Sequence, residues 1–137
     1  MSWDERTRLL LGEANAGKLR NANVLVVGLG GVGAYAAEML CRAGIGRMTL
    51  IDGDVIEESN RNRQLPALVS TTKKSKTEVM ANRLLDINPD IQLTLHQEYL
   101  RDERTIEVLD SQYYDYVVDC IDTLSPKTFL IYHALSK

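Results

Sequence analysis

Residues 23–44, "NVLVVGLGGVGAYAAEMLCRAG", join a strand, a glycine-rich turn and a helix, and this order indicates the fold class. The short β-branched run over residues 23–28 is typical of a strand buried on both faces of a parallel sheet. Small and apolar residues then share one helical face over residues 34–43, and Gly44 supplies the stop. With a second strand over "RMTLID", residues 47–52, the stretch predicts a βαβ unit with a right-handed crossover.

Downstream of this unit, strand-like and helix-like segments continue to alternate. Ser75 and Glu78 in "SKTE" form a capping box, which is typical of a helix start, and apolar residues then recur at helical spacing. The other expected elements are a strand over residues 91–96, a short helix over 103–109 with Asp102 as its cap, a strand over 115–122 and a last helix opened by Ser125 and Pro126.

This alternation predicts an α/β, doubly wound, Rossmann-like fold with a mainly parallel sheet of about four strands flanked by helices. We expect residues 1–22 to form an N-terminal helical segment and residues 23–137 to form the Rossmann-like domain. No strand-like run follows the last expected helix, so we expect a truncated sheet.

The composition is that of one globular domain. The chain has 137 residues and a formal net charge of -3, so no overall positive field favours wholesale binding of nucleic acid. Its two cysteines lack CxxC spacing, and no long apolar run resembles a membrane segment or a secretory signal. We therefore expect a cytoplasmic protein without a membrane segment.

The glycine-rich turn "GLGGVG" fits the G-x-G-x-x-G pattern between a strand and a helix. Its missing side chains let phosphate oxygens approach the N–H groups of a helix N-terminus, and an acid at the next strand end can hold ribose hydroxyls. Both a dinucleotide and ATP satisfy these features, and a turn used for tight packing alone is the alternative. The residues concerned are Gly28, Gly30, Gly31, Gly33 and Asp52.

The segment "DGDVIEESNRNRQL", residues 52–65, carries more polar side chains than a ribose needs. A triphosphate bears about three to four negative charges, which need cations beyond the glycine turn. Arg63, and in second place Arg61, can supply that charge. The segment therefore favours ATP, with a solvated polar loop as the alternative. Its candidate ligand-binding residues are Asp54, Asn60, Arg63 and Gln64.

Lys76 lies four residues before Met80, on the apolar face of its expected helix, and it occupies the first turn. The helix dipole opposes a cation there by ~0.3 to 1 kcal/mol, so we expect an anionic partner such as an ATP phosphate. The alternative is a lysine whose stem packs while its ammonium reaches water. Lys74, just outside the helix, is expected to be solvated.

Two acids in "VVDCIDTLSPK" lie at the carboxyl end of the last expected strand, the sheet edge where open α/β folds bind ligands. Asp122 can coordinate magnesium together with phosphate oxygens, or it can simply cap the next element. Asp119 is expected to make hydrogen bonds within the strand end. Cys120 between them is expected to be a buried strand residue rather than a nucleophile.

Five segments, in this order and over nearly the whole chain, resemble the ubiquitin-activating-enzyme-like adenylyltransferase family (ThiF, MoeB and HesA). They are "RTRLLLGE", "VLVVGLGGVGAYAAEML", "IDGDVIEESNRNRQ", "KSKTEVMANRLLDINP" and "VVDCIDTLSPK". Within this family, "RLLLGE", "NRNRQ" and "CIDTLSPK" are most similar to the branch of tRNA threonylcarbamoyladenosine dehydratases.

The resemblance implies ATP and Mg²⁺ as cofactors. It assigns the four glycines of the turn to the phosphates, Asp52 to the ribose and Asp122 to the metal. Asn60 joins Arg63 and Lys76 at the triphosphate. Arg8 would reach the ATP site of a neighbouring subunit, which makes a homodimer the active unit. The residues expected to act in catalysis are Arg8, Arg63, Lys76 and Asp122.

The activity that the resemblance implies is adenylation of a carboxylate, followed by ring closure of threonylcarbamoyladenosine in tRNA. One alternative substrate is the C-terminus of a ubiquitin-like sulfur-carrier protein, with a sulfur-transfer partner. A second alternative, from the glycine motif and Asp52, is an NAD-dependent oxidoreductase domain. Family members are considerably longer, so we expect this chain to be the nucleotide-binding half, with the C-terminal half of the family fold absent.

Overall fold

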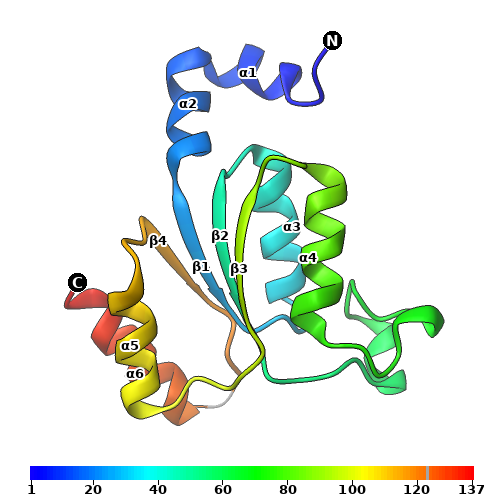
Figure 1. Cartoon of the computed structure of the whole chain (residues 1–137), viewed down its shortest axis with the longest axis vertical. Helices are drawn as coiled ribbons and strands as arrows, with labels where there is room; N and C mark the ends of the chain where they lie inside the picture. Colours follow the sequence, from blue (N-terminus) through cyan, green and yellow to red (C-terminus); the bar gives the residue numbers. More distant parts are fainter. Residues whose placement is uncertain (123) are drawn as a thin grey trace.

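The computed structural model describes residues 1–122 and 124–137, with the backbone alone for 124 and 125 (Figure 1). Its centre is a four-stranded sheet in the order β3-β2-β1-β4, and every pairing is parallel. This confirms the predicted α/β fold with a mainly parallel sheet. The strands are β1 (Asn23–Val27), β2 (Arg47–Ile51), β3 (Gln92–His96) and β4 (Tyr116–Asp119).

Helices cover both faces of the sheet, and two more precede it (Figure 1). Two short 3-10 helices, η1 (Glu58–Asn62) and η2 (Val69–Thr71), lie between β2 and the fourth α-helix. No helix in the described part of the chain is long and apolar enough to cross a membrane. The α-helices are α1 (Glu5–Leu11) and α2 (Glu13–Asn21) before the sheet, α3 (Gly33–Ala43) and α4 (Lys76–Ile87) on one face, and α5 (Asp102–Ser111) and α6 (Leu124–Leu135) on the other.

The side chains of β1 alternate between two apolar clusters, as the two-residue period of a strand requires. Val24 and Val26 pack with the residues of α3 and α4, whereas Leu25 and Val27 pack with those of α5 and α6. All four are at most 3% exposed. The run of β-branched residues is therefore a central strand buried on both faces, as predicted.

The strand register brings the carboxyl ends of all four strands to one edge of the sheet. At the last pair of each ladder, Val27 of β1 stands beside both Ile51 and Asp119, and Ile51 stands beside His96. The loops that leave these ends therefore start close together, and this edge holds the site described below.

The helix starts test two of the sequence predictions. Ser75 caps α4, because its side chain accepts a hydrogen bond from Glu78 N. The prediction that Asp102 caps α5 is wrong. Arg101 occupies the cap position with an extended backbone, and Asp102 is already the first helical residue, with φ of 45°. The predicted role of the Ser125 side chain lies outside the described residues.

Candidate functional site

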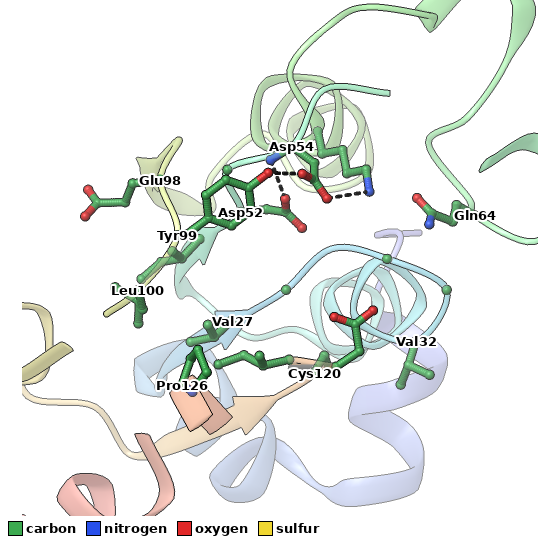
Figure 2. A pocket seen from close by; sticks show the side chains of 18 of the residues that line it. Val27, Val32, Asp52, Asp54, Gln64, Glu98, Tyr99, Leu100, Cys120 and Pro126 are labelled. Atoms are coloured by element: carbon green, nitrogen blue, oxygen red, sulfur yellow. Dashed lines mark hydrogen bonds and ion pairs between the residues drawn. The ribbon is translucent and has the colours of Figure 1, made fainter. Parts of the chain in front are cut away.

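A pocket of about 400 Å³ lies where the strands end (Figure 2). Its wall is formed by the glycine turn, the loops after β2, β3 and β4, the η1 region and the start of α4. The structure brings together residues that are up to 94 positions apart in the predicted set, from Gly28 to Asp122. The predicted ligand-binding residues that line it are Gly28, Gly30, Gly31, Asp52, Asp54, Asn60, Arg63, Gln64, Lys76 and Asp122.

Two glycines of the turn are required by packing. Gly28 has φ of 97°, and a Cβ there would stand 2.6 Å from the carbonyl oxygen of Cys120. A Cβ on Gly33 would stand 1.7 Å from the carbonyl oxygen of Gly28, and Gly33 is not among the residues that line the pocket. The tight-packing interpretation therefore explains Gly33, which was predicted to line the phosphates.

The other two glycines are not required by packing. A Cβ on Gly30 would stand 3.7 Å from Gln64 Nε2, and one on Gly31 would stand 3.8 Å from Arg63 Cγ, which are ordinary van der Waals distances. Both residues line the pocket. The folded chain would accept a side chain at either position, so packing does not explain why both residues are glycines.

Asp52 links the glycine turn to the end of β2 through side-chain hydrogen bonds. Its Oδ2 accepts a hydrogen bond from Leu29 N at 2.7 Å, and its Oδ1 accepts one from Asp54 N at 2.7 Å. A carboxylate has about four acceptor positions, so each oxygen can still accept a hydroxyl. The sequence-based hypothesis that Asp52 holds a ribose did not include these two backbone hydrogen bonds.

Gln64 has a buried amide at the wall of the pocket. The residue is 8% exposed, and its Oε1 has no hydrogen-bond partner within the described residues. Figure 2 shows the amide end turned toward the interior of the pocket. A buried amide without its full set of hydrogen bonds costs about 1 to 3 kcal/mol, which a polar ligand or water in the pocket would relieve.

The two arginines of the polar segment have different surroundings. Arg63 lines the pocket, and its Nη1 donates to Ser59 O at 3.1 Å. Arg61 pairs with Glu58 at 3.0 Å and does not line the pocket. Asn60 lines the pocket too, and its Oδ1 accepts from Glu57 N, which leaves the amide nitrogen as its donor. Of these two arginines, Arg63 is therefore the one that a ligand in the pocket can reach.

Lys76 is buried at the first turn of α4. Its side chain is 5% exposed, and Nζ lies 3.5 Å from Oδ2 of Asp54. The side chain is therefore largely removed from solvent and lines the pocket, which the snorkelling alternative does not predict. Lys74 is exposed, as expected for a solvated neighbour.

The acids after β4 have separate roles. Asp119 accepts a hydrogen bond from Ile121 N at 3.1 Å and pairs with Lys127 Nζ at 2.7 Å, so it organises the strand end as predicted. Asp122 is exposed and lines the pocket. The described residues contain no cluster of three metal-ligating side chains. One exposed carboxylate suits magnesium that is bound mainly through phosphate and water.

Cys120 differs from its predicted surroundings, whereas the prediction for Arg8 concerns a neighbouring subunit. Cys120 follows the last residue of β4, is half-buried and lines the pocket, because the strand ends earlier than the sequence predicted. Burial raises the pKa of its thiol, which does not suit a nucleophile.

Arg8 pairs with Asp4 at 3.2 Å and Glu13 at 2.9 Å, and it does not line the pocket of its own chain.

Sequence reasoning missed the residues that the loop after β3 contributes. Tyr99 and Leu100 line the pocket, and the Tyr99 hydroxyl donates a hydrogen bond to Oδ1 of Asp54. Leu100 is buried, and with Ile121 and Pro126 it gives the pocket an apolar side. A signal was present in the sequence, because "EYL", residues 98–100, begins two residues after a predicted strand that ends at the same sheet edge as Asp122.

Relatives of this chain include two kinds of enzyme. The tRNA threonylcarbamoyladenosine dehydratase of Haemophilus influenzae is 45% identical over 114 residues, which are 83% of this chain and 43% of that protein. The adenylyltransferase and sulfurtransferase MOCS3 of Drosophila virilis is 39% identical over 113 residues, 82% of this chain and 25% of that protein.

A solved structure matches the fold. Escherichia coli tRNA N6-threonylcarbamoyladenosine dehydratase, TcdA, in complex with ATP, has a TM-score of 0.93 at 39% identity, and the match covers 98% of this chain and 56% of that one. This chain spans about half the length of the curated dehydratases it matches, between 43% and 52%.

The sequence pattern of the ThiF family matches residues 5–136, nearly the whole chain. It includes the glycine turn, the polar segment after β2 and the strand end with Asp122, which form the pocket. The chain therefore belongs to the ThiF family.

Proposed function

We propose that the pocket binds magnesium-ATP. The observation that carries this proposal is the convergence of Arg63, Gln64 and Lys76 on an open glycine turn within one pocket. A dinucleotide has its pyrophosphate at the turn and would leave the cations Arg63 and Lys76 without a phosphate partner. A solved relative at 39% identity is a complex with ATP, which supports the same ligand here.

The pocket offers a partner for each part of the nucleotide. Asp52 would accept hydrogen bonds from the ribose hydroxyls, and the backbone N–H groups near Gly30 and Gly31 would meet phosphate oxygens. Asp122 would hold Mg²⁺ together with phosphate oxygens and water. When bound, the ion would neutralise charge on the departing pyrophosphate.

The bound nucleotide would activate a substrate carboxylate. A carboxylate oxygen forms a bond to the α-phosphorus, the bond from that phosphorus to the bridging oxygen breaks, and pyrophosphate leaves with the electron pair. Arg63 and Lys76 would stabilise the charge that develops on the departing oxygens. Such a step needs positioning and charge neutralisation rather than a protein nucleophile, consistent with the raised pKa of Cys120.

We propose that this carboxylate belongs to threonylcarbamoyladenosine in tRNA. An oxygen or nitrogen of the carbamoyl group would then form a bond to the acyl carbon of the adenylate, which closes the ring. The bond from that carbon to the AMP oxygen breaks, AMP leaves with the electron pair, and a carbamoyl nitrogen loses its proton. The 45% identity to a tRNA threonylcarbamoyladenosine dehydratase supports the assignment. We also propose a cytoplasmic location, where tRNA is available as substrate.

A second candidate is adenylation of the C-terminus of a ubiquitin-like sulfur-carrier protein, followed by a sulfur-transfer partner. The observation that favours it is the 39% identity to an adenylyltransferase and sulfurtransferase. Both candidates use the same pocket and the same first step, so they differ only in the substrate that delivers the carboxylate.

Two measurements test the function. Calorimetric titration should give tighter binding of magnesium-ATP than of NADH, and the reverse order would favour an oxidoreductase domain. Exchange of labelled pyrophosphate into ATP should depend on threonylcarbamoyl-tRNA. Exchange that depends on a carrier protein instead would select the second candidate, and no exchange with either would reject adenylation.

We also propose a homodimer in which Arg8 completes the neighbouring site. α1, which carries Arg8, buries none of its residues within its own chain, and Leu9 and Leu10 are 79% and 84% exposed. α2 joins α1 to the amino end of β1, whereas the pocket lies at the carboxyl end, where Val27 lines it. A second copy would cover this helix and receive Arg8.

Mixing two inactive variants tests this arrangement. Suppose that Arg8 acts in the partner subunit and that Arg8→Ala and Lys76→Ala subunits are mixed in equal amounts. Half of the randomly formed dimers then contain one subunit of each kind and have one intact site. About a quarter of the wild-type number of active sites should therefore return. If Arg8 acts in its own chain, mixing restores nothing. Light scattering on the same samples establishes whether dimers are present.

A further inference from the structure

Tyr99, Asp54 and Lys76 all line the pocket and form a chain of contacts. Figure 2 shows Tyr99 beside Asp54. The Tyr99 hydroxyl donates to Oδ1 of Asp54, and Oδ2 lies 3.5 Å from Lys76 Nζ. The Lys76 side chain is 5% exposed, whereas that of Asp54 is 50% exposed. A buried cation therefore depends on a carboxylate that is partly in water.

The backbone of Asp54 is already fixed relative to α4. Asp54 N donates to Asp52 Oδ1 at 2.7 Å, and Lys76 N donates to Asp54 O at 3.2 Å. Val55 and Ser75, the next residue of the loop and the cap of the helix, pair in an antiparallel bridge. The freedom that remains is rotation of the Asp54 side chain, and the Tyr99 hydroxyl restricts it.

The loop is shaped to receive the Tyr99 ring. A Cβ on Gly53 would stand 2.5 Å from Cε2 of that ring, so the glycine leaves the space that the ring occupies. The hydrogen bond to Asp54, and then burial, raise the pKa of Tyr99 to about 12. The phenol therefore stays protonated and donates at neutral pH.

We propose that Tyr99 is a positioning residue for the nucleotide site, which acts through Asp54 to hold the Lys76 ammonium in the pocket. This inference rests on the proposed function, because the ligand is magnesium-ATP. Without the hydroxyl, the Asp54 carboxylate turns toward solvent and the Lys76 ammonium loses its fixed partner. The ligand must then order the lysine as it binds, which lowers affinity.

Tyr99→Phe tests the inference because it removes the hydroxyl and keeps the ring. In calorimetric titrations of the chain with magnesium-ATP, we expect the affinity to fall about three- to tenfold, with an unchanged melting temperature. Tyr113→Phe is the matched control. Tyr113 is 80% exposed and does not line the pocket, so its affinity should equal that of wild type.

A second pair of variants separates positioning from direct contact with the nucleotide. If Tyr99 acts through Lys76, adding Tyr99→Phe to Lys76→Ala should cause no further loss, since the group to be positioned is gone. The inference would be overturned if Tyr99→Phe lowered the magnesium-ATP affinity equally in wild type and in Lys76→Ala. It would also be overturned if Tyr99→Phe alone left the affinity unchanged while wild type binds magnesium-ATP. Absence of magnesium-ATP binding by wild type would instead overturn the proposed function, and the inference with it.

Discussion

Gly33 lies so close to Gly28 that a Cβ on Gly33 would stand 1.7 Å from the Gly28 carbonyl oxygen. This contact seats the first turn of α3 directly against the end of β1. Gly33→Ala must therefore shift backbone rather than a flexible side chain, and we expect a loss of about 3 kcal/mol or more in the free energy of unfolding. Chemical denaturation monitored by circular dichroism measures this loss, and an unchanged midpoint would contradict the packing role.

Gly31→Ala should behave in the opposite way. The nearest atom to its Cβ would be Arg63 Cγ at 3.8 Å, so the fold accepts the methyl group. The methyl group would enter the pocket where phosphate is proposed to approach the backbone. We expect an unchanged melting temperature and a loss of magnesium-ATP affinity of at least about tenfold, or ~1.4 kcal/mol. Full affinity in Gly31→Ala would show that the ligand does not approach this residue.

Lys76→Ala tests the charge proposed to meet the phosphates. We expect the affinity for magnesium-ATP to fall by a charge-assisted contact, ~1.5 to 3 kcal/mol. Stability without ligand should change little, because the buried cation opposes the helix dipole and its partner Asp54 is half in water. Lys74→Ala, at an exposed position outside the pocket, is the control for both calorimetry and thermal melting. A large loss of stability with full affinity would make Lys76 a structural residue.

Much of the site could be predicted because parallel strands align their carboxyl ends. The glycine turn after β1, Asp52 after β2 and Asp122 after β4 each follow a recognisable strand, so the sequence alone placed them at one edge. Lys76 could be placed because it lies in the first turn of a capped helix, four residues before Met80 on the apolar face. The positions of these residues follow from the periodicity of single strands and helices, which can be read directly from the sequence.

The other features of the site and fold depend on how the loops run, which the sequence pattern does not reveal. Arg61 and Arg63 are equivalent by residue type, and the turn of η1 decides that Arg63 faces the pocket. The contact of Tyr99 with Asp54 joins residues 45 positions apart across two loops, and no periodicity encodes it. Asp102 was misassigned as a cap because capping is decided by backbone angles, and Arg101 has the extended ones.

Glu38 provides a pH-dependent link between α3 and α4. The residue is 5% exposed, and its carboxylate accepts hydrogen bonds from Arg83 Nε and, at 3.4 Å, from Arg42 Nε. The hydrogen bond from Arg83 is the largest of the effects that lower the Glu38 pKa. We expect Arg83→Met to lower the free energy of unfolding at neutral pH by about 1 to 3 kcal/mol, because the buried carboxylate loses its main donor.

The sign of the pH dependence follows from the lowered pKa. A group with a depressed folded pKa contributes stability above its unfolded value, about 4.3, and loses that contribution as the pH falls through the folded pKa. The difference between wild type and Arg83→Met should therefore shrink below about pH 4. Arg61→Met, which removes a partner of the exposed Glu58, should cost less than about 1 kcal/mol at any pH. A constant difference would contradict the role of ionised Glu38.

The two cysteines should differ in their rates of alkylation. Burial raises the pKa of Cys41 to about 11, and its Sγ lies 3.6 Å from Leu84 O inside the core between α3 and α4. Since the thiolate is the reactive form, about one thiol in a thousand is ionised at about pH 8, and the core excludes the reagent. Cys120 is half-buried and lines the pocket, so a small alkylating reagent should reach it first.

Magnesium-ATP should slow alkylation of Cys120 because the proposed nucleotide fills the pocket that the thiol lines. Mass spectrometry of iodoacetamide-treated protein at about pH 8 follows each cysteine separately. Raising the pH should speed labelling of Cys120, whose raised pKa keeps it mostly protonated, and Cys120→Ser should abolish the early product. Cys41 should react only as the chain unfolds, with a rate that follows unfolding. Protection of Cys120 by NADH but not by magnesium-ATP would reject the proposed ligand, whereas early reaction of Cys41 would contradict its burial in the core.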